Sequence, residues 1–193
     1  GCVELLSAAY RKSFLAEAGI AMATARAGNV IGGGDWSIDR LLPDILRNFE
    51  KGTPIEIRNP NATRPWQHVL EPLSGYLSLA EKLYSNDGKS FAEGWNFGPK
   101  DEGVRSVKWI VDELCRGWSS DAAWTEQGGE HPYEANFLKL DISKAQERLN
   151  WSPRWSLQTA LENTISWHQA WIRSKDMREI CSQQIDSYIK SGF

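Results

Sequence analysis

The sequence predicts an α/β protein in which parallel strands alternate with helices, and three observations support this fold class. Residues 1–19 place apolar side chains at helical spacing and end at a glycine. Residues 20–30, "IAMATARAGNV", are small and apolar without alternation, as in a parallel strand covered on both faces. A glycine-rich turn, "GGGD", follows at once, and such turns join strands to helices.

The elements after this turn continue the alternation. Pro43 suits the first position of a helix that Gly52 ends, and Asp141 and Ser156 are candidate helix N-caps. Further helices are predicted over residues 68–86, 105–118, 141–151 and 156–175 and from Met177 onward. Strands are predicted over residues 54–59, 94–99 and 122–127, and loops over 60–65 and 128–137.

Composition excludes several classes of protein. The net charge is −3 and the basic residues are scattered, so we expect no nucleic-acid partner and no anionic membrane surface. No apolar run approaches the roughly 20 residues of a membrane span. Cys2, Cys115 and Cys181 lie far apart and fit neither a zinc site nor a disulfide framework, so we expect no metal and a cytoplasmic location.

The glycine run raises the possibility of a dinucleotide site. A dinucleotide fingerprint needs glycines in the order GxGxxG or GxxGxxG, directly opening a helix. Here Gly28 is followed by Gly32, Gly33 and Gly34, and Pro43 delays the next helix. The spacing therefore does not fit, and the alternative is that the glycines only allow a tight loop.

Polar residues near predicted strand ends suggest a different ligand. Asn29 stands at the carboxyl end of the first strand, Arg64 in the loop after the second, and Asn96 at the end of the third. Open α/β sheets bind ligands at this edge, and a guanidinium with side-chain amides suits a diphosphate. Taken singly, each residue is more often an ordinary surface or turn residue.

Longer stretches carry a family resemblance. "ARAGNVIGGGDWSIDRLLPDIL", "IRNPNATRPWQHVLEPLSGYLSLAEKLY", "WNFGP" and "LKLDISKAQERLNWSPRWSLQTALENTISWHQAW" together resemble the C-terminal portion of the CDP-glucose 4,6-dehydratases, which are extended short-chain dehydrogenase/reductases. The resemblance implies the last elements of a doubly wound Rossmann-type parallel sheet plus a small mixed α/β substrate-binding lobe. It divides the chain into Rossmann elements (1–52), a mainly nucleotide-sugar-binding lobe with returning Rossmann elements (53–173) and a helical extension (174–193).

The resemblance also implies chemistry. Such enzymes use NAD and a Tyr-x-x-x-Lys pair to convert CDP-glucose to CDP-4-keto-6-deoxyglucose and water, in deoxysugar biosynthesis for lipopolysaccharide O-antigen. Tyr10 and Lys12 do not have that spacing, so we assign no catalytic residue in this chain. We expect the chain to be a fragment, without turnover by itself, of a lyase that forms a homodimer through helices including the opening one.

Binding residues follow from the resemblance by position. Asn29 and Arg64 would hold the sugar diphosphate, Ile57 would line the base pocket, and the backbone of Ala27 and Gly28 would pass the nicotinamide of NAD. The remaining substrate-binding candidates are Arg40, Leu41, Trp66, Asn96, His131 and Tyr133.

Some of these assignments have alternatives. His131 stands where many relatives carry an arginine, so the second cationic phosphate contact is in doubt, and Tyr133 or His131 could serve in its place. Trp66 could be only a core residue, and His68 fits a structural role better than acid–base catalysis. For the whole protein, the alternatives are an epimerase or dehydratase acting on a UDP-, GDP- or dTDP-sugar, or a non-catalytic binding module.

Overall fold

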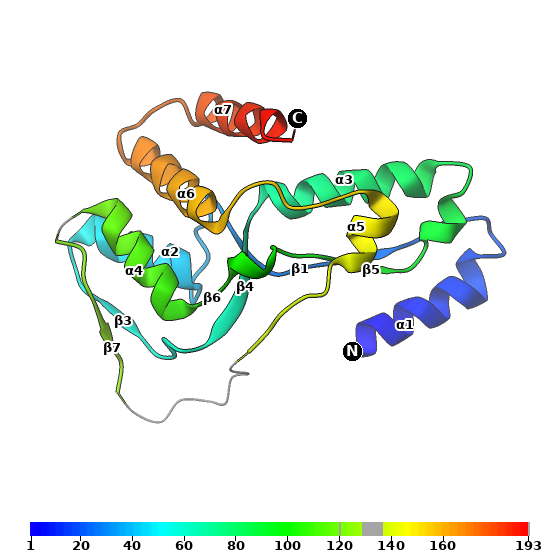
Figure 1. The fold of residues 1–193 in the computed structure, drawn as a ribbon, viewed down its shortest axis with the longest axis horizontal. Coiled ribbons are helices and arrows are strands. Elements are labelled where there is room, and N and C mark those ends of the chain that lie inside the picture. The colour runs from blue at the N-terminus through cyan, green and yellow to red at the C-terminus, as the bar shows by residue number, and fades with distance from the viewer. Residues whose placement is uncertain (120, 129–136, 193) are drawn as a thin grey trace.

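A computed structural model describes residues 1–119, 121–128 and 137–192 (Figure 1). The helices are α1 (Cys2–Tyr10), α2 (Leu41–Lys51), α3 (Leu70–Tyr84), α4 (Val107–Trp118), α5 (Ser143–Leu149), α6 (Leu157–Ile172) and α7 (Met177–Lys190). The strands are β1 (Thr24–Ala27), β2 (Asn29–Ile31), β3 (Ile55–Ile57), β4 (Thr63–His68), β5 (Gly94–Phe97), β6 (Val104–Ser106) and β7 (Trp124–Glu126).

The described strands form three small sheets, in which parallel pairing dominates. β1 pairs with β5 and β3 pairs with β7, both in parallel. β4 lies between β2, which is parallel to it, and β6, which is antiparallel. Helices connect strands that are distant in the sequence, which confirms the predicted α/β class with parallel sheets.

The chain passes from the first sheet to the second at one residue. β1 ends at Ala27 and β2 begins at Asn29, so Gly28 alone lies between them. A Cβ atom on Gly28 would lie 2.4 Å from the carbonyl oxygen of Pro65. Glycine is therefore required here because β4 approaches the backbone too closely for any side chain.

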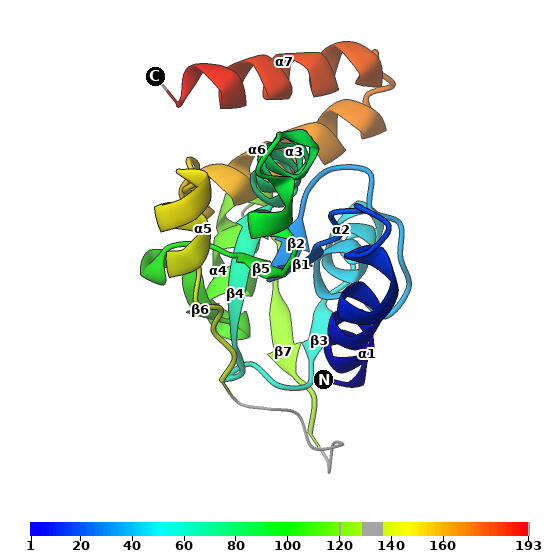
Figure 2. The ribbon, with the colours of Figure 1, turned by 90° about the vertical axis from the view of Figure 1, so that its right-hand side faces the viewer.

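Two apolar cores hold these sheets. One core lies among α2, α4, α6 and β3 and includes Ile45, Ile110 and Leu161, all buried. The other packs α3 and α5 against β5 around Trp95 and Phe97, which have no exposed surface. Figure 2 shows α6 and α7 stacked above the strands, with α1 and α2 to one side.

The first strand is less buried than the sequence predicts. Ala25 and Arg26 in β1 are exposed, and the expectation of a strand covered on both faces is wrong for the described residues. α1 also exposes apolar side chains, with Leu5 74% and Leu6 69% exposed. α1 lies on the opposite side of the β1–β5 pair from α3 (Figure 1), and its apolar side chains have little to pack against.

The loop predicted over residues 60–65 is only partly correct, because its second half is a strand. Proline and asparagine favour turns, and the turn forms, with Ala62 N donating to Asn59 O at 3.2 Å. The strand β4 nevertheless begins at Thr63, because residues 63–65 pair with β6. Arg64 therefore lies in a strand and not in a loop.

The predicted helix ends agree better with the structure. Gly52 follows α2 in the left-handed conformation, and the Ser156 side chain accepts a hydrogen bond from Thr159 N at the start of α6. α2 begins at Leu41, two residues before Pro43. The helix predicted over 1–19 continues after α1 as a π-helical turn, Arg11–Leu15, and Gly19 has a φ of +72°.

Candidate functional site

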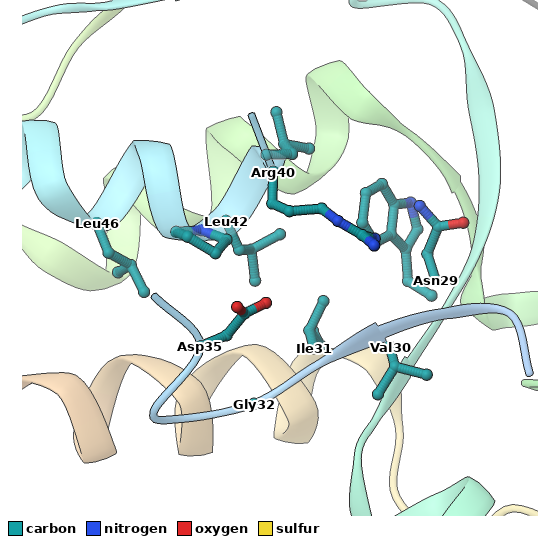
Figure 3. A pocket seen from close by; sticks show the side chains of 11 residues that line it. Asn29, Val30, Ile31, Gly32, Asp35, Arg40, Leu42 and Leu46 are labelled. Atoms are coloured by element: carbon teal, nitrogen blue, oxygen red, sulfur yellow. The ribbon is translucent and has the colours of Figure 1, made fainter. Parts of the chain in front are cut away.

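A pocket of about 340 Å³ lies where β2, β3 and β4 meet the start of α2. Its size falls at the lower end of the range for small-molecule sites. A second pocket of about 70 Å³ adjoins it and shares four of its residues (Figure 3). The structure brings six of the predicted binding residues to the larger pocket: Asn29, Arg40, Leu41, Ile57, Arg64 and Trp66.

Asn29 and Arg40 face each other across the smaller pocket. Asn29 opens β2 directly after the switch between sheets and pairs in register with Trp66. Arg40 has an extended backbone and forms the N-cap of α2. Its side chain reaches from the helix start toward Asn29 in Figure 3. An amide and a guanidinium thus point into the same space from different elements.

Arg64 and Trp66 come from β4, two residues apart and so on the same face of the strand. The Arg64 Nη1 donates to its neighbour's carbonyl, Thr63 O, at 3.0 Å. Trp66 is only 4% exposed, and its Nε1 donates to Arg105 O at 3.0 Å. Trp66 is therefore a core residue that also forms a wall of the pocket.

The far wall belongs to β3 and the turn after it. Ile57 is buried at the end of β3, and Glu56, Arg58 and Asn59 line the same wall. Sequence reasoning missed Glu56 and Asn59, because a short strand and its turn show no periodic signal that separates pocket residues from surface residues. The wall therefore offers an apolar surface edged by hydrogen-bonding groups.

The pocket carries charges of both signs. Arg40, Arg58 and Arg64 supply three guanidinium groups, and the acidic lining residues are Asp39, Asp44 and Glu56. In the smaller pocket, hydrogen bonding by Ser37 is the main influence that lowers the pKa of Asp35, and Arg40 and Arg47 lower it further. Asp35 is thus a carboxylate near neutral pH. Guanidinium groups that line one cleft are groups that bind phosphates.

The remaining predicted site residues lie elsewhere. Asn96 stands on β5, where its Oδ1 accepts from Arg26 Nε at 2.8 Å and its Nδ2 donates to Asp141 O at 3.0 Å. Ala27 ends β1 and Gly28 follows it, before β2, and the close approach of Pro65 explains the glycine. His131 and Tyr133 lie outside the described residues.

The glycine run has a packing role. A Cβ atom on Gly33 would lie 2.1 Å from ring carbons of Trp167, and one on Gly32 would lie 2.9 Å from Val69. Only Gly34 of the three has a positive φ, +79°. α2 begins at Leu41, so no helix N-terminus follows the run directly. This arrangement agrees with the prediction that the run is not a dinucleotide fingerprint, and the described glycines do not fit the pyrophosphate of a dinucleotide.

His68 is buried outside both pockets. Its Nδ1 accepts from Leu70 N at 3.3 Å, and its ring lies 4.8 Å from that of Trp155. Burial lowers the pKa of His68 to about 4, so the ring is neutral near pH 7. In the described part of the chain, no group of three or more possible metal ligands gathers, and no helix is long and apolar enough to cross a bilayer.

Comparison with solved structures identifies the class of protein that has this fold. UDP-glucuronic acid 4-epimerase from Bacillus cereus, in complex with UDP-glucuronic acid and NAD, superposes with a TM-score of 0.72 at 23% identity, over 87% of this chain and 50% of that one. dTDP-glucose 4,6-dehydratase from Bacillus anthracis, in complex with NAD, gives 0.58 at 17% identity, over 86% and 49%. The fold is therefore that of the Rossmann-type sugar-nucleotide epimerases and dehydratases.

Sequence comparison points to a particular member of this class. The chain is 51% identical over 196 residues to CDP-glucose 4,6-dehydratase from Salmonella typhimurium (strain LT2), which confirms the predicted resemblance. The alignment covers 99% of this chain and 54% of that relative, so the chain spans about half of the relative's length. No protein-family model matches the chain.

Proposed function

We propose that this chain is the nucleotide-sugar-binding part of an NAD-dependent CDP-glucose 4,6-dehydratase, a lyase that converts CDP-glucose to CDP-4-keto-6-deoxyglucose and water. The observation that carries the proposal is the 340 Å³ pocket, in which Asn29, Arg40 and Arg64 converge from three elements. The 51% identity to the Salmonella enzyme supports the choice of substrate. The pocket residues would bind and orient the nucleotide sugar, and we assign none of them to the chemical step.

Different residues of the pocket would bind the diphosphate and the base of the substrate. Arg64 and Arg40 would donate to the diphosphate oxygens, since guanidinium groups bind phosphate in a planar, paired geometry. Asn29 would donate an amide hydrogen to the same group without adding charge. Ile57 would pack on the base, and Glu56, Arg58 and Asn59 offer the donors and acceptors that could read its edge.

NAD belongs to the same proposal. The Bacillus cereus and Bacillus anthracis relatives were solved with NAD. In this chain we assign only the backbone of Ala27 and Gly28 to the neighbourhood of the nicotinamide, where NAD would accept and return a hydride. The described residues offer no glycine turn that opens a helix, so we assign the pyrophosphate site to the whole protein and not to this stretch alone.

Calorimetric titration of the full-length gene product tests the substrate. CDP-glucose should bind more tightly than UDP-glucose, and Arg64→Ala should weaken CDP-glucose binding about 10- to 100-fold, the size of a lost charged hydrogen-bonding group. Arg116→Ala is the matched control, because Arg116 is exposed on α4 and pairs with Glu113. Unchanged affinity in Arg64→Ala would remove the diphosphate assignment, and equal or reversed preference for UDP-glucose would remove the CDP-sugar.

A second candidate is an epimerase or dehydratase for a UDP-sugar. The Bacillus cereus epimerase and a UDP-glucose 4-epimerase from Thermotoga maritima were solved with UDP-sugars, and they share this fold. The same titration separates the two candidates. A homodimer and a cytoplasmic location stay predictions, and the exposed apolar side chains of α1 support the homodimer.

A further inference from the structure

The residues that join the glycine run to α2 determine where Arg40 lies. We call residues 35–40 the site loop, because Asp35 and Arg40 at its two ends line the smaller pocket. Every residue of the site loop is exposed, and Asp39 has a φ of +59°. A loop with so little buried surface needs specific contacts to keep one conformation.

Arg47 on α2 supplies such contacts from outside the pockets. Its Nη1 donates to Trp36 O at 3.2 Å, and its Nη2 donates to Ser37 O at 3.0 Å. The same guanidinium forms an ion pair with Asp44 on the preceding turn of α2. Arg47 lines neither the larger nor the smaller pocket, so it is not placed to touch a ligand there.

The middle of the site loop is also seated on α6. The ring of Trp36 lies 4.5 Å from that of Trp171 and 6.3 Å from that of Trp167. The glycines just before the loop lie against Trp167 as well. The chain from Gly33 to Trp36 therefore lies against α6. Arg47 then connects Ser37, three residues before Arg40, to α2 by a hydrogen bond.

We infer that Arg47 is a positioning residue for nucleotide-sugar binding, which acts by fixing the site loop so that Arg40 reaches the diphosphate. The inference rests on the proposed function. Without the guanidinium, the exposed loop would sample more conformations, and binding would have to pay the entropy of ordering it. The loss of affinity on removing Arg47 should therefore appear only in protein that still carries Arg40.

A double-mutant cycle in the full-length gene product tests this inference. The affinity for CDP-glucose is measured by calorimetry for the unmodified protein, Arg47→Met, Arg40→Ala and the double variant. Methionine keeps the unbranched stem and the helix propensity but removes the donors. Arg47→Met should weaken binding about tenfold by itself and less than about twofold when Arg40 is already alanine.

The controls separate the possible outcomes. Arg116→Ala should leave the affinity unchanged, because within the described part of the chain Arg116 pairs with its own helix neighbour Glu113 and lines neither pocket. An Arg47→Met effect of equal size in both backgrounds, or no effect in either, would overturn the positioning role. Failure of the unmodified protein to bind CDP-glucose would instead overturn the proposed function. Arg47→Gln replaces Arg47→Met should that variant not fold.

Discussion

His68 is a single residue whose burial makes the stability of the fold depend on pH. The ring is 2% exposed, and its Nε2 has no partner among the described residues. A histidine in the unfolded chain has a pKa of about 6.5, whereas burial lowers that of folded His68 to about 4. Between these values the unfolded state binds more protons, so the free energy of unfolding falls as the pH falls.

We predict a loss of about 3 kcal/mol from this residue between pH 6.5 and pH 4, with the contribution fully present above pH 6.5. Denaturant unfolding at several pH values measures it. His68→Gln should lower stability at pH 7 and flatten the curve across this window. A curve of unchanged slope in His68→Gln would show that another group causes the dependence.

Single residues differ in how far the sequence could predict them. Asn29 and Arg64 are polar side chains beside predicted strands, and both line the larger pocket. Asn96 on β5 has the same sequence signal, but its side chain forms hydrogen bonds with the Arg26 side chain and the Asp141 backbone. A polar residue near a predicted strand end does not show which sheet that strand belongs to.

At the scale of elements, the turn from β2 into the site loop depends on the absence of side chains. The backbone of Gly33 lies against the ring of Trp167 on α6, and a methyl group added to Gly33 would clash with that ring. We predict that Gly33→Ala lowers the free energy of unfolding by about 1–3 kcal/mol, the usual cost of forcing extra volume into a packed site. Thermal or denaturant unfolding measures the change.

Gly128→Ala is the control for this substitution, because a Cβ atom on Gly128 would meet no atom of the described residues within 4 Å and its φ is not positive. Its effect should stay within about 0.5 kcal/mol. Equal effects of the two substitutions would show that backbone entropy, and not contact with Trp167, sets the cost.

Helix boundaries were easier to predict than strands for a physical reason. The caps of α2 and α6 are local, since Gly52 and Ser156 act on backbone groups within a few residues. The start of β4 depends on pairing with β6, in which Thr63 pairs with Ser106 and Arg64 with Arg105. These partners lie more than 40 residues further along the chain, and the local turn signal hid the strand. Propensity alone cannot represent such a pairing.

At the scale of the whole molecule, a buried carboxylate joins three distant parts of the chain. Glu71 on α3 is 1% exposed and accepts hydrogen bonds from the backbone of Arg154 and Trp155. The hydroxyl of Tyr188 on α7 donates to the same carboxylate at 2.7 Å and lies 2.9 Å from Ser74 Oγ. Figure 2 shows α7 packed over α6 at the edge of the molecule, where this contact helps to hold it.

Tyr188→Phe should destabilise the protein by about 1–3 kcal/mol, because Glu71 loses a donor in a buried site. Tyr84→Phe removes the same hydroxyl from a side chain that is 96% exposed, and it should have almost no effect. The comparison uses denaturant unfolding of both variants. Equal stability of the two would show that water replaces the lost donor and that the contact does not hold α7.

The sequence by itself determined the α/β class, most helices and the resemblance to CDP-glucose 4,6-dehydratase, because periodicity, caps and quoted motifs are properties of neighbouring residues. Only the tertiary structure decided that Arg64 lies on β4, that Asn96 stands apart and that Arg47 ties the site loop. These facts depend on pairings and contacts between segments far apart in the chain. The glycine run combines both kinds of information, since its spacing argued against a dinucleotide site and its packing against Val69 and Trp167 explains why Gly32 and Gly33 carry no side chain.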